Sequence, residues 1–426
     1  MLGEIKSFLV RFSLFRWVQY KWTVIRYFRA HALLLNKVRQ SGRASICFLV
    51  SSLPMWRLQD FYELLAKDSR FSLQIILLPF QTYAPKERDR CMRELKQFFD
   101  KRNCPYALFD SPSVQNQWRE RRPDIIFYQQ LYSTIYPEPF EIDLNLDKLI
   151  CFIPYSLMTC RGDWVYNTKH TNVAWKLFYP TRMHLDFARR HSFNRAGNVS
   201  VVGEPNAVKY LSSAYAFPWK PQSEGRPKRV IWAPHFSISE TGYLHRASFL
   251  WMAELMKEIV RQYEGRIQFV LKPHPRLVSS LYSHPDWGEE KTNRYFDWWN
   301  SAPNAQVETG QYIDLFMTSD AMIHDCGSFT AEYLYTNKPV LFVSNDFKGA
   351  YSSLDYFGTK CMDLHYKGGS EEDVFSFLDK VVLGEDDPLA AERRRFYDDI
   401  LVNEASREVG KNIYQIMTQE LFSTDS

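Results

Sequence analysis

The chain has 426 residues, of which 45% are hydrophobic and 24% charged, and its formal net charge is +4. This length allows two domains with separate cores, and the composition excludes a largely disordered chain. The positive charge is uneven, because residues 1–43 hold nine Lys and Arg and one acidic residue, which leaves the rest of the chain net negative. We therefore expect no nucleic-acid binding by the body of the protein.

Residues 1–43 form a predicted basic, aromatic helical arm. From Lys6 to Arg29 a positive charge recurs every three to five residues, which excludes the uninterrupted apolar core of a signal peptide. The chain has no run of about 18 uncharged apolar residues that could span a membrane. Aromatic rings among basic residues suit a helix lying on an anionic membrane surface; the alternative is a helix packed onto the next domain. The aromatic residues are Trp17, Tyr20, Trp22, Tyr27 and Phe28.

Residues 44–215 alternate short apolar runs with helical patterns, which is typical of a parallel sheet with helices on both faces. We predict an N-terminal Rossmann-like domain here. The predicted strands are Ala44–Val50, Ser72–Leu78, Tyr106–Phe109, Asp124–Tyr128, Lys148–Ile153 and Val199–Val202, and the predicted helices are Arg57–Lys67 and Lys86–Lys101.

Residues 216–228 hold three prolines and a glycine without periodicity, so we predict a linker. Residues 229–388 then repeat the alternation as a second domain, and residues 389–426 are predicted helices that pack back across the linker. The pattern predicts two doubly wound parallel-sheet domains facing a cleft. The predicted elements of the second domain are strands Arg229–Ala233, Ile267–Lys272, Ala305–Glu308, Ala321–His324 and Val340–Val343, and helices His245–Tyr263 and Ser328–Tyr335.

Three motifs in the second half each join a predicted strand to a polar turn: Trp232-Ala-Pro-His235, Lys272-Pro-His-Pro275 and His324-Asp-Cys-Gly-Ser328. The carboxyl ends of parallel strands share one edge of the sheet, where ligands bind. The sequence therefore predicts a pocket there for an anionic substrate.

The Lys272-Pro-His-Pro-Arg276 motif places His274 between two prolines that stiffen its loop. Lys272 and Arg276 add cations on either side, which suits a diphosphate leaving group, and a histidine can protonate or hydrogen-bond the leaving oxygen. His235 on the neighbouring turn is the second candidate catalytic histidine. A hydrogen-bonded structural role is the alternative for both.

The third motif leads from a strand into a predicted helix that Ser328 would cap, beside Gly327, where the backbone can approach a phosphate. Glu332 lies one turn further on, where it could accept hydrogen bonds from a ribose. The candidate donor-binding residues in this block are Asp325, Gly327, Ser328, Phe329, Thr330 and Glu332.

Two other chemistries receive less support from the sequence. His235, His274, His324 and Asp325 are metal-ligand types, but they lie on separate turns without the close spacing of a metal motif. Cys326 lacks the pattern of a nucleophile elbow. The seven cysteines contain no C-x-x-C pair, which predicts reduced thiols in a cytosolic protein.

In combination, the Trp-Ala-Pro turn, the Lys-Pro-His-Pro turn and the block Ile323-His-Asp-Cys-Gly-Ser-Phe-Thr-Ala-Glu-Tyr-Leu-Tyr-Thr-Asn-Lys-Pro-Val340 resemble the CDP-glycerol glycerophosphotransferase family of teichoic-acid and capsule polymerases. The resemblance covers residues 229–345. It implies a GT-B fold in which residues 44–215 form the acceptor domain and residues 229–388 the nucleotide-donor domain. It also implies transfer without metal or cofactor, a CDP-linked polyol donor and attachment to the inner face of the cell membrane.

Carried over by position, His274 resembles the family's catalytic histidine, with Arg276 near it. Gly327 and Ser328 resemble its phosphate-binding turn, although Cys326-Gly327-Ser328 has one hydroxyl fewer than the usual motif. Glu332 resembles the acid near the ribose.

The acceptor base remains open at this stage. Where the family has a His-Gly-Thr loop, this chain has Ile153-Pro-Tyr-Ser156, which contains no histidine. Tyr155, Asp163 and His170 are the candidates for the base, and Ser156 is a further candidate acceptor-side residue.

The predicted function is transfer of a polyol phosphate from a CDP-linked donor to a lipid-linked or polymeric glycan, teichoic or capsule acceptor, with release of CMP. The predicted location is cytoplasmic, peripheral on the inner face of the membrane. The alternatives are a GT-B glycosyltransferase that uses a nucleotide sugar, and a nucleotide-binding scaffold without catalysis.

Overall fold

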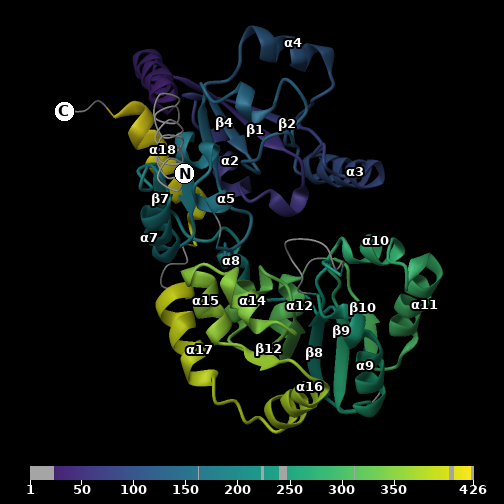
Figure 1. The fold of residues 1–426 in the computed structure, drawn as a ribbon. Helices are drawn as coiled ribbons and strands as arrows, with labels where there is room; N and C mark the ends of the chain where they lie inside the picture. Colours follow the sequence, from purple (N-terminus) through teal and green to yellow (C-terminus); the bar gives the residue numbers. More distant parts are fainter. Residues whose placement is uncertain are drawn as a thin grey trace, which may run out of the picture. The chain divides into compact units, whose positions relative to one another are not determined.

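The computed structural model describes residues 24–161, 163–221, 225–238, 247–310, 312–402 and 407–423, without the side chains of Asp163 and Trp164. These residues form two compact units (Figure 1). Unit 1 comprises the described residues of Met1–Tyr155, Asp163–Pro205 and Ser406–Ser426, and unit 2 those of Ser156–Gly162 and Asn206–Ala405. The chain therefore passes from one unit to the other four times.

The sheet of unit 1 has seven strands in the order β3-β2-β1-β4-β5-β6-β7. Every pairing is parallel. The strands are β1 (Ala44–Val50), β2 (Phe71–Leu77), β3 (Ala107–Leu108), β4 (Ile125–Tyr128), β5 (Leu149–Phe152), β6 (Lys176–Tyr179) and β7 (Val199–Val201).

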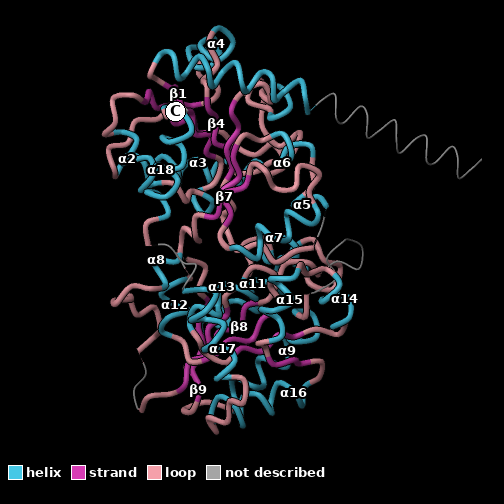
Figure 2. Tube along the Cα trace, turned by 90° about the vertical axis from the view of Figure 1, so that its left-hand side faces the viewer, coloured by secondary structure: helices cyan, strands magenta, loops and turns pink. Residues whose placement is uncertain are grey.

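Helices cover both faces of this sheet (Figure 2). One face of β1 packs against α2, α3 and the C-terminal α18, which lies beside α2 in Figure 1. The helices of unit 1 are α2 (Gln59–Ala66), α3 (Pro85–Lys101), α4 (Pro112–Glu120), α5 (Asp163–Tyr166), α6 (Lys169–Val173), α7 (Arg182–His191) and α18 (Val409–Phe422), with 3-10 turns η1 (Leu53–Met55) and η2 (Ile142–Leu144).

Residues 24–41 are helical, and one side of this helix is part of unit 1. Val38 is buried in the same core as β1, and the His31 ring bonds the Leu146 carbonyl at 2.9 Å. The aromatic residues of the predicted arm before residue 24 lie outside the described residues. Within them, no helix is both long enough and apolar enough to span a bilayer.

The sheet of unit 2 has six parallel strands in the order β10-β9-β8-β11-β12-β13. They are β8 (Lys228–Ala233), β9 (Ile267–Leu271), β10 (Ala305–Val307), β11 (Ala321–His324), β12 (Val340–Val343) and β13 (Tyr366–Gly368).

Successive strand residues in unit 2 enter different cores because their side chains alternate between the two faces. Leu341 and Val343 pack with the helices that follow β8 and β9, whereas Phe342 packs with α14 and α15 on the other face. The helices are α8 (Ala207–Tyr210), α9 (Phe249–Gln262), α10 (Leu277–Tyr282), α11 (Gly288–Ser301), α12 (Ile313–Thr318), α13 (Phe329–Glu332), α14 (Phe347–Ser352), α15 (Tyr356–Asp363), α16 (Glu371–Ser376) and α17 (Ala390–Phe396), with a 3-10 turn η3 (Tyr333–Thr336) and π-helical turns η4 (Phe377–Leu383) and η5 (Tyr397–Val402).

The predicted fold class, two doubly wound parallel sheets, is confirmed. Of the described strands, β6 and β13 are absent from the prediction. Residues 216–228, predicted as a linker, fall within unit 2, where Trp219 is buried and donates its indole N–H to Thr318 Oγ1 at 2.9 Å. All seven cysteines are free thiols.

Candidate active site

The three predicted turns follow β9, β8 and β11, which are consecutive strands in the sheet of unit 2. Their carboxyl ends therefore lie side by side at one edge. The backbone links the turns directly, since His274 N–H donates to the Pro234 carbonyl at 3.1 Å and His235 N–H donates to Asp325 Oδ1 at 2.6 Å. The structure thus brings together the residues that the sequence predicted to converge.

His235 and His274 form the centre of this edge. Their ring centroids lie 4.9 Å apart, and Phe236 contacts both imidazoles. The Arg276 guanidinium stacks over the Phe236 ring at 4.3 Å and is exposed. The Phe236 contact, which the sequence analysis did not single out, holds an exposed cation beside the two histidines.

The protonation state of His274 follows from its surroundings. Its Nδ1 accepts the Arg276 backbone N–H at 3.1 Å, so the ring proton of the neutral form sits on Nε2. Burial, and secondarily the positive neighbours His235, Arg276 and Lys272, lowers the pKa of His274 to about 3. At neutral pH this side chain is therefore a neutral hydrogen-bond donor and not an imidazolium acid.

Asp325 was predicted to bind the donor, but it lies beneath the edge, 1% exposed. Oδ2 accepts the backbone N–H of Ser248 at 2.5 Å and its hydroxyl at 2.9 Å, while Oδ1 accepts the His235 N–H. Burial raises the pKa of Asp325 to about 6, against these hydrogen bonds. The carboxylate therefore ties the turn after β8 to the start of α9.

Lys272 is also less available than predicted, because the residue is 6% exposed. Its Nζ donates to the Gly310 carbonyl at 2.8 Å, and burial lowers its pKa to about 8 while Glu308 opposes the shift. Lys272 thus holds the segment after β10 against the β9 turn.

Exposure to solvent changes along the chain after Cys326, at the end of the third turn. Gly327, Ser328 and Phe329 are half-buried, whereas Thr330 is buried and donates its hydroxyl to the Cys326 carbonyl at 3.0 Å. A Cβ added to Gly327 would meet no described atom within 4 Å. The backbone of this turn is therefore open to a ligand, while the Thr330 hydroxyl is already engaged.

Glu332 is 2% exposed. Its Oε2 accepts the hydroxyls of Tyr210 at 2.9 Å and Tyr312 at 2.5 Å. The carboxylate thereby joins α8, the start of α12 and α13. Its predicted contact with a ribose would have to share the carboxylate with these two phenols.

The predicted acceptor-side residues are divided between the two units. Tyr155 is 38% exposed, and its carbonyl accepts from Arg57 Nε at 3.0 Å. Ser156 belongs to unit 2, unlike the other three. Asp163 begins α5, and its side chain lies outside the described part of the chain.

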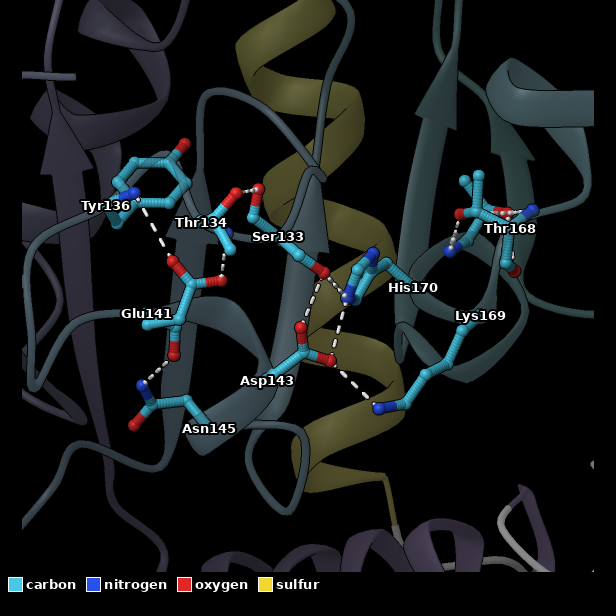
Figure 3. A network of polar contacts seen from close by, with 10 residues as sticks. Ser133, Thr134, Tyr136, Glu141, Asp143, Asn145, Thr168, Lys169 and His170 are labelled. Carbon is cyan, nitrogen blue, oxygen red and sulfur yellow. Dashed lines mark hydrogen bonds and ion pairs between the residues drawn. The ribbon is translucent and has the colours of Figure 1, made fainter. Parts of the chain in front are cut away.

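His170 lies in a polar network on unit 1 (Figure 3). Its Nε2 contacts Asp143 Oδ1 at 3.1 Å, and Lys169 Nζ approaches the same oxygen at 2.8 Å. Ser133 donates to Asp143 Oδ2 at 2.5 Å. Burial opposes ionisation of Asp143, but these hydrogen bonds outweigh it and lower its pKa to about 2.

The network gives His170 the carboxylate partner that a general base needs. Figure 3 shows the second ring nitrogen of His170 directed away from Asp143. The sequence analysis missed Asp143 because it is 27 positions from His170, and no local pattern connects the two. Across the described residues, no group of three or more His, Cys, Asp and Glu side chains is arranged to hold a metal ion.

Comparison with known families identifies one part of the chain. The sequence model of the CDP-glycerol:poly(glycerophosphate) glycerophosphotransferase family matches residues 200–360. The predicted resemblance to this family is confirmed. The matched segment includes all three turns and the Gly327–Ser328 backbone, and its similarity to this family supports an enzyme like the CDP-glycerol glycerophosphotransferases. A comparison with curated proteins finds no match.

Solved structures resemble the chain over most of its length but at low identity. The wall teichoic acid polymerase TagF has a TM-score of 0.51 and 12% identity, with coverage of 95% of this chain and 96% of that one. UDP-GlcNAc 2-epimerase from Neisseria meningitidis has a TM-score of 0.55 and 12% identity, covering 88% of this chain and 100% of its own. The corresponding enzyme of Methanocaldococcus jannaschii has a TM-score of 0.54 and 13% identity, with coverage of 88% and 99%.

At these identities the likeness concerns the fold. It confirms the GT-B-type pair of α/β domains that the glycerophosphotransferase resemblance implied.

Proposed function

We propose that this protein transfers a polyol phosphate, such as glycerol phosphate, from a CDP-linked donor to a membrane-associated glycan, teichoic or capsule acceptor, and releases CMP. The observation that carries the proposal is the meeting of His235, His274 and Arg276 at one sheet edge inside the segment that matches the glycerophosphotransferase family. Two fold neighbours have been solved with nucleotide ligands, TagF with CDPG and the Methanocaldococcus jannaschii epimerase with UDP-GlcNAc and UDP, which supports a nucleotide-diphosphate donor.

The proposed step is a displacement at phosphorus. An acceptor hydroxyl oxygen bonds to the polyol-bearing phosphorus, the bond from that phosphorus to the bridging oxygen breaks, and CMP leaves with the electron pair. The neutral His274 donates an Nε2–H hydrogen bond to the leaving oxygen, and Arg276 stabilises the negative charge. Positioning and electrostatics would supply most of the rate.

The acceptor proton requires a base, and among the three predicted candidates His170 has the best-defined geometry. Asp143 holds Nε2, which leaves Nδ1 to take the proton from the acceptor hydroxyl. The Asp143 carboxylate then stabilises the imidazolium that forms.

The membrane is the proposed location of the acceptor. On the helix of residues 24–41, Ile25, Phe28 and Leu33 are 42%, 43% and 72% exposed, and the helical spacing places Ile25 and Leu33 on the side opposite to buried Val38. Arg29 lies on the same exposed side. Apolar side chains beside a cation suit contact with an anionic bilayer at the cytoplasmic face.

Incubation of the protein with a panel of CDP-polyols and nucleotide sugars, each with a glycan or lipid-linked acceptor, tests the proposal through the nucleotide released. Release of CMP with transfer of label to the acceptor is expected. Release of a nucleoside diphosphate would instead show glycosyl transfer. This alternative is compatible with the fold, which resembles that of an epimerase bound to UDP-GlcNAc. Tight nucleotide binding without any released product would favour a scaffold.

Membrane contact is tested by substitution, because Val38 and His31 are buried and removal of the arm would damage unit 1. Phe28→Glu with Leu33→Glu should reduce sedimentation with anionic liposomes. Tyr356→Glu, which changes an aromatic residue 53% exposed on unit 2, is the matched control and should sediment like the wild type. Equal sedimentation of all three proteins would contradict membrane contact by this helix.

A further inference from the structure

The segment Ser156–Gly162 is a short excursion of the chain. It directly follows the end of β5 and Tyr155 in unit 1, yet it belongs to unit 2, and the chain resumes in unit 1 at Asp163. Its described residues, 156–161, contain no helix and no strand longer than an isolated bridge. Its position must therefore be set by contacts with the rest of unit 2.

Backbone hydrogen bonds fix this segment beside the start of α15. Asp355 N–H donates to the Thr159 carbonyl at 2.9 Å, and Arg161 N–H donates to the Ser353 carbonyl at 2.7 Å. Cys160 pairs with Leu354 as an antiparallel bridge. These contacts are regular backbone pairings and define one position for the segment.

The Thr159 side chain connects the segment to the candidate site. Thr159 is 3% exposed, and its hydroxyl donates to the Gly327 carbonyl at 3.3 Å. In a trans peptide the C=O and the following N–H point in opposite directions. The bond from Thr159 therefore aims the Ser328 N–H away from the segment.

Gly358 allows the segment to approach this closely. A Cβ at position 358 would lie 2.3 Å from the Thr159 carbonyl oxygen and 2.9 Å from the Thr159 Cβ. Both are closer than real Cβ contacts, so any larger residue at position 358 would displace Thr159. Two independent features, a hydroxyl and an absent side chain, thus place Thr159 against the Gly327–Ser328 peptide.

We propose that Thr159 is a positioning residue for the donor site: its hydroxyl orients the Gly327–Ser328 peptide so that the Ser328 N–H can bind a phosphate oxygen of the CDP-linked donor. The inference rests on the proposed function of the Cys326–Ser328 turn. A segment that continues from strand β5 of unit 1 thereby supports the donor-side turn of unit 2.

The test compares Thr159→Val, which removes the hydroxyl at nearly constant volume, with Thr159→Ser, which keeps it. Loss of one hydrogen bond should weaken CDP-glycerol binding and raise its KM roughly three- to tenfold, with kcat changed less than roughly twofold. Thr159→Ser should restore both to within about twofold of the wild type. Calorimetry gives the binding constant independently of turnover.

Hydrogen exchange of the ligand-free full chain supplies a readout that needs no donor. Amides of the peptide that covers residues 325–332 should exchange faster in Thr159→Val than in the wild type and Thr159→Ser. Amides of the neighbouring strand β12 should be unchanged, which separates a local effect from loss of stability.

Gly358→Ala is the second variant, because it keeps the hydroxyl but displaces the segment. It should weaken donor binding at least as much as Thr159→Val. Gly369→Ala is its matched control, since a Cβ there would meet only ordinary contacts of 3.5 Å or more.

Equal donor affinity and equal exchange in the wild type and Thr159→Val would overturn the inference. If the wild type binds no CDP-glycerol, the proposed function fails, while the exchange comparison still decides whether Thr159 holds the turn.

Discussion

Gln129 and Asp325 occupy equivalent places in the two units. Each directly follows the strand that pairs with the first strand of its sheet, β4 beside β1 and β11 beside β8, where the order of strands reverses. Gln129 Oε1 accepts the backbone N–H groups of Ser51 and Ser52 at 2.7 and 3.0 Å. Asp325 accepts those of His235 and Ser248.

Both side chains satisfy backbone donors at a topological switch point, but one is a neutral amide and the other a carboxylate. Ligands bind outside the strand ends at such points. The edge of unit 2 is therefore built from ionisable groups with displaced pKa values, whereas the equivalent clamp of unit 1 is neutral. Under the proposed function, the ionisable groups at the donor edge belong to unit 2, whereas Gln129 supplies no titratable group at the equivalent edge of unit 1.

Among the substitutions that test this difference between the units, His274→Ala should have the largest effect on activity. Loss of the donor to the leaving oxygen should lower kcat by about 100-fold or more, with CDP-glycerol affinity changed by less than about threefold. His284→Ala is the matched control, because His284 also precedes a proline and its Nδ1 accepts the Asp286 N–H at 3.2 Å, outside the site. Unchanged turnover in His274→Ala would remove it from the mechanism.

His170→Ala should produce a similar or smaller loss. Removal of a general base should lower kcat by about 100-fold at neutral pH without weakening donor binding. Asp143→Asn, which removes the charged partner of the ring, should act in the same direction to a smaller degree. His191→Ala, an exposed histidine of the same unit, controls for loss of an imidazole. Wild-type rates in His170→Ala would exclude His170 as the base and leave Tyr155 and Asp163 as the candidates.

Asp325→Asn should change the pH profile more than the maximal rate. Since the pKa of Asp325 is about 6 in the folded protein, protonation below that pH removes the ionised acceptor of two backbone N–H groups, and kcat/KM should fall on the acid side. In Asp325→Asn this fall near pH 6 should disappear, with a rate about five- to twentyfold lower at pH 7.5. Persistence of the same acid limb in the variant would assign it to another group.

The contribution of Asp325 to wild-type stability should have the opposite pH dependence to its effect on activity, and Asp325→Asn should lack this dependence. The folded pKa of Asp325 lies above its unfolded value, so its contribution to stability is present at low pH and is lost as pH rises through about 6. Gln129→Glu should introduce into unit 1 the same loss of folding stability as the pH rises. Urea unfolding midpoints of both variants at pH 5 and 7.5 test this exchange of an amide and a carboxylate.

The smallest predicted effect concerns the buried His324. Burial lowers its pKa to about 3, so the unfolded chain binds a proton that the folded chain does not. Its contribution to stability is therefore present above about pH 6.5 and lost as pH falls towards 3. His324→Asn, which keeps an acceptor for the Cys326 N–H, should have a urea midpoint that falls less between pH 7.5 and 5 than that of the wild type. An equal fall would show that His324 is not responsible.

Much of the fold follows from local patterns. The run Ala44–Val50 and the run Val340–Val343 were predicted with the bounds that the structure has, because each is a continuous apolar segment between polar turns. The strand Lys176–Tyr179 was missed, since four residues carry too little periodicity to distinguish a short strand from a loop. The strand Tyr366–Gly368 was missed for the same reason.

The motif that carries the family resemblance also contains structural residues. Lys338 donates from Nζ to the carbonyls of Phe316 and Met317 at 3.2 and 2.6 Å, at the end of α12. A cation at a helix C-terminus stabilises the free carbonyls there. The sequence identified the motif, but it could not separate this cap from residues that face a ligand.

By itself, the sequence determined the strand–helix alternation, the turns that carry His235, His274 and Gly327, and the resemblance of that region to glycerophosphotransferases, because apolar periodicity and turn chemistry are properties of neighbouring residues. Only the tertiary structure decided the strand order that makes those turns adjacent, the burial that leaves His274 neutral and Asp325 beneath the edge, and the pairing of His170 with Asp143. These properties depend on contacts between residues far apart in the chain, and on how much water those contacts exclude.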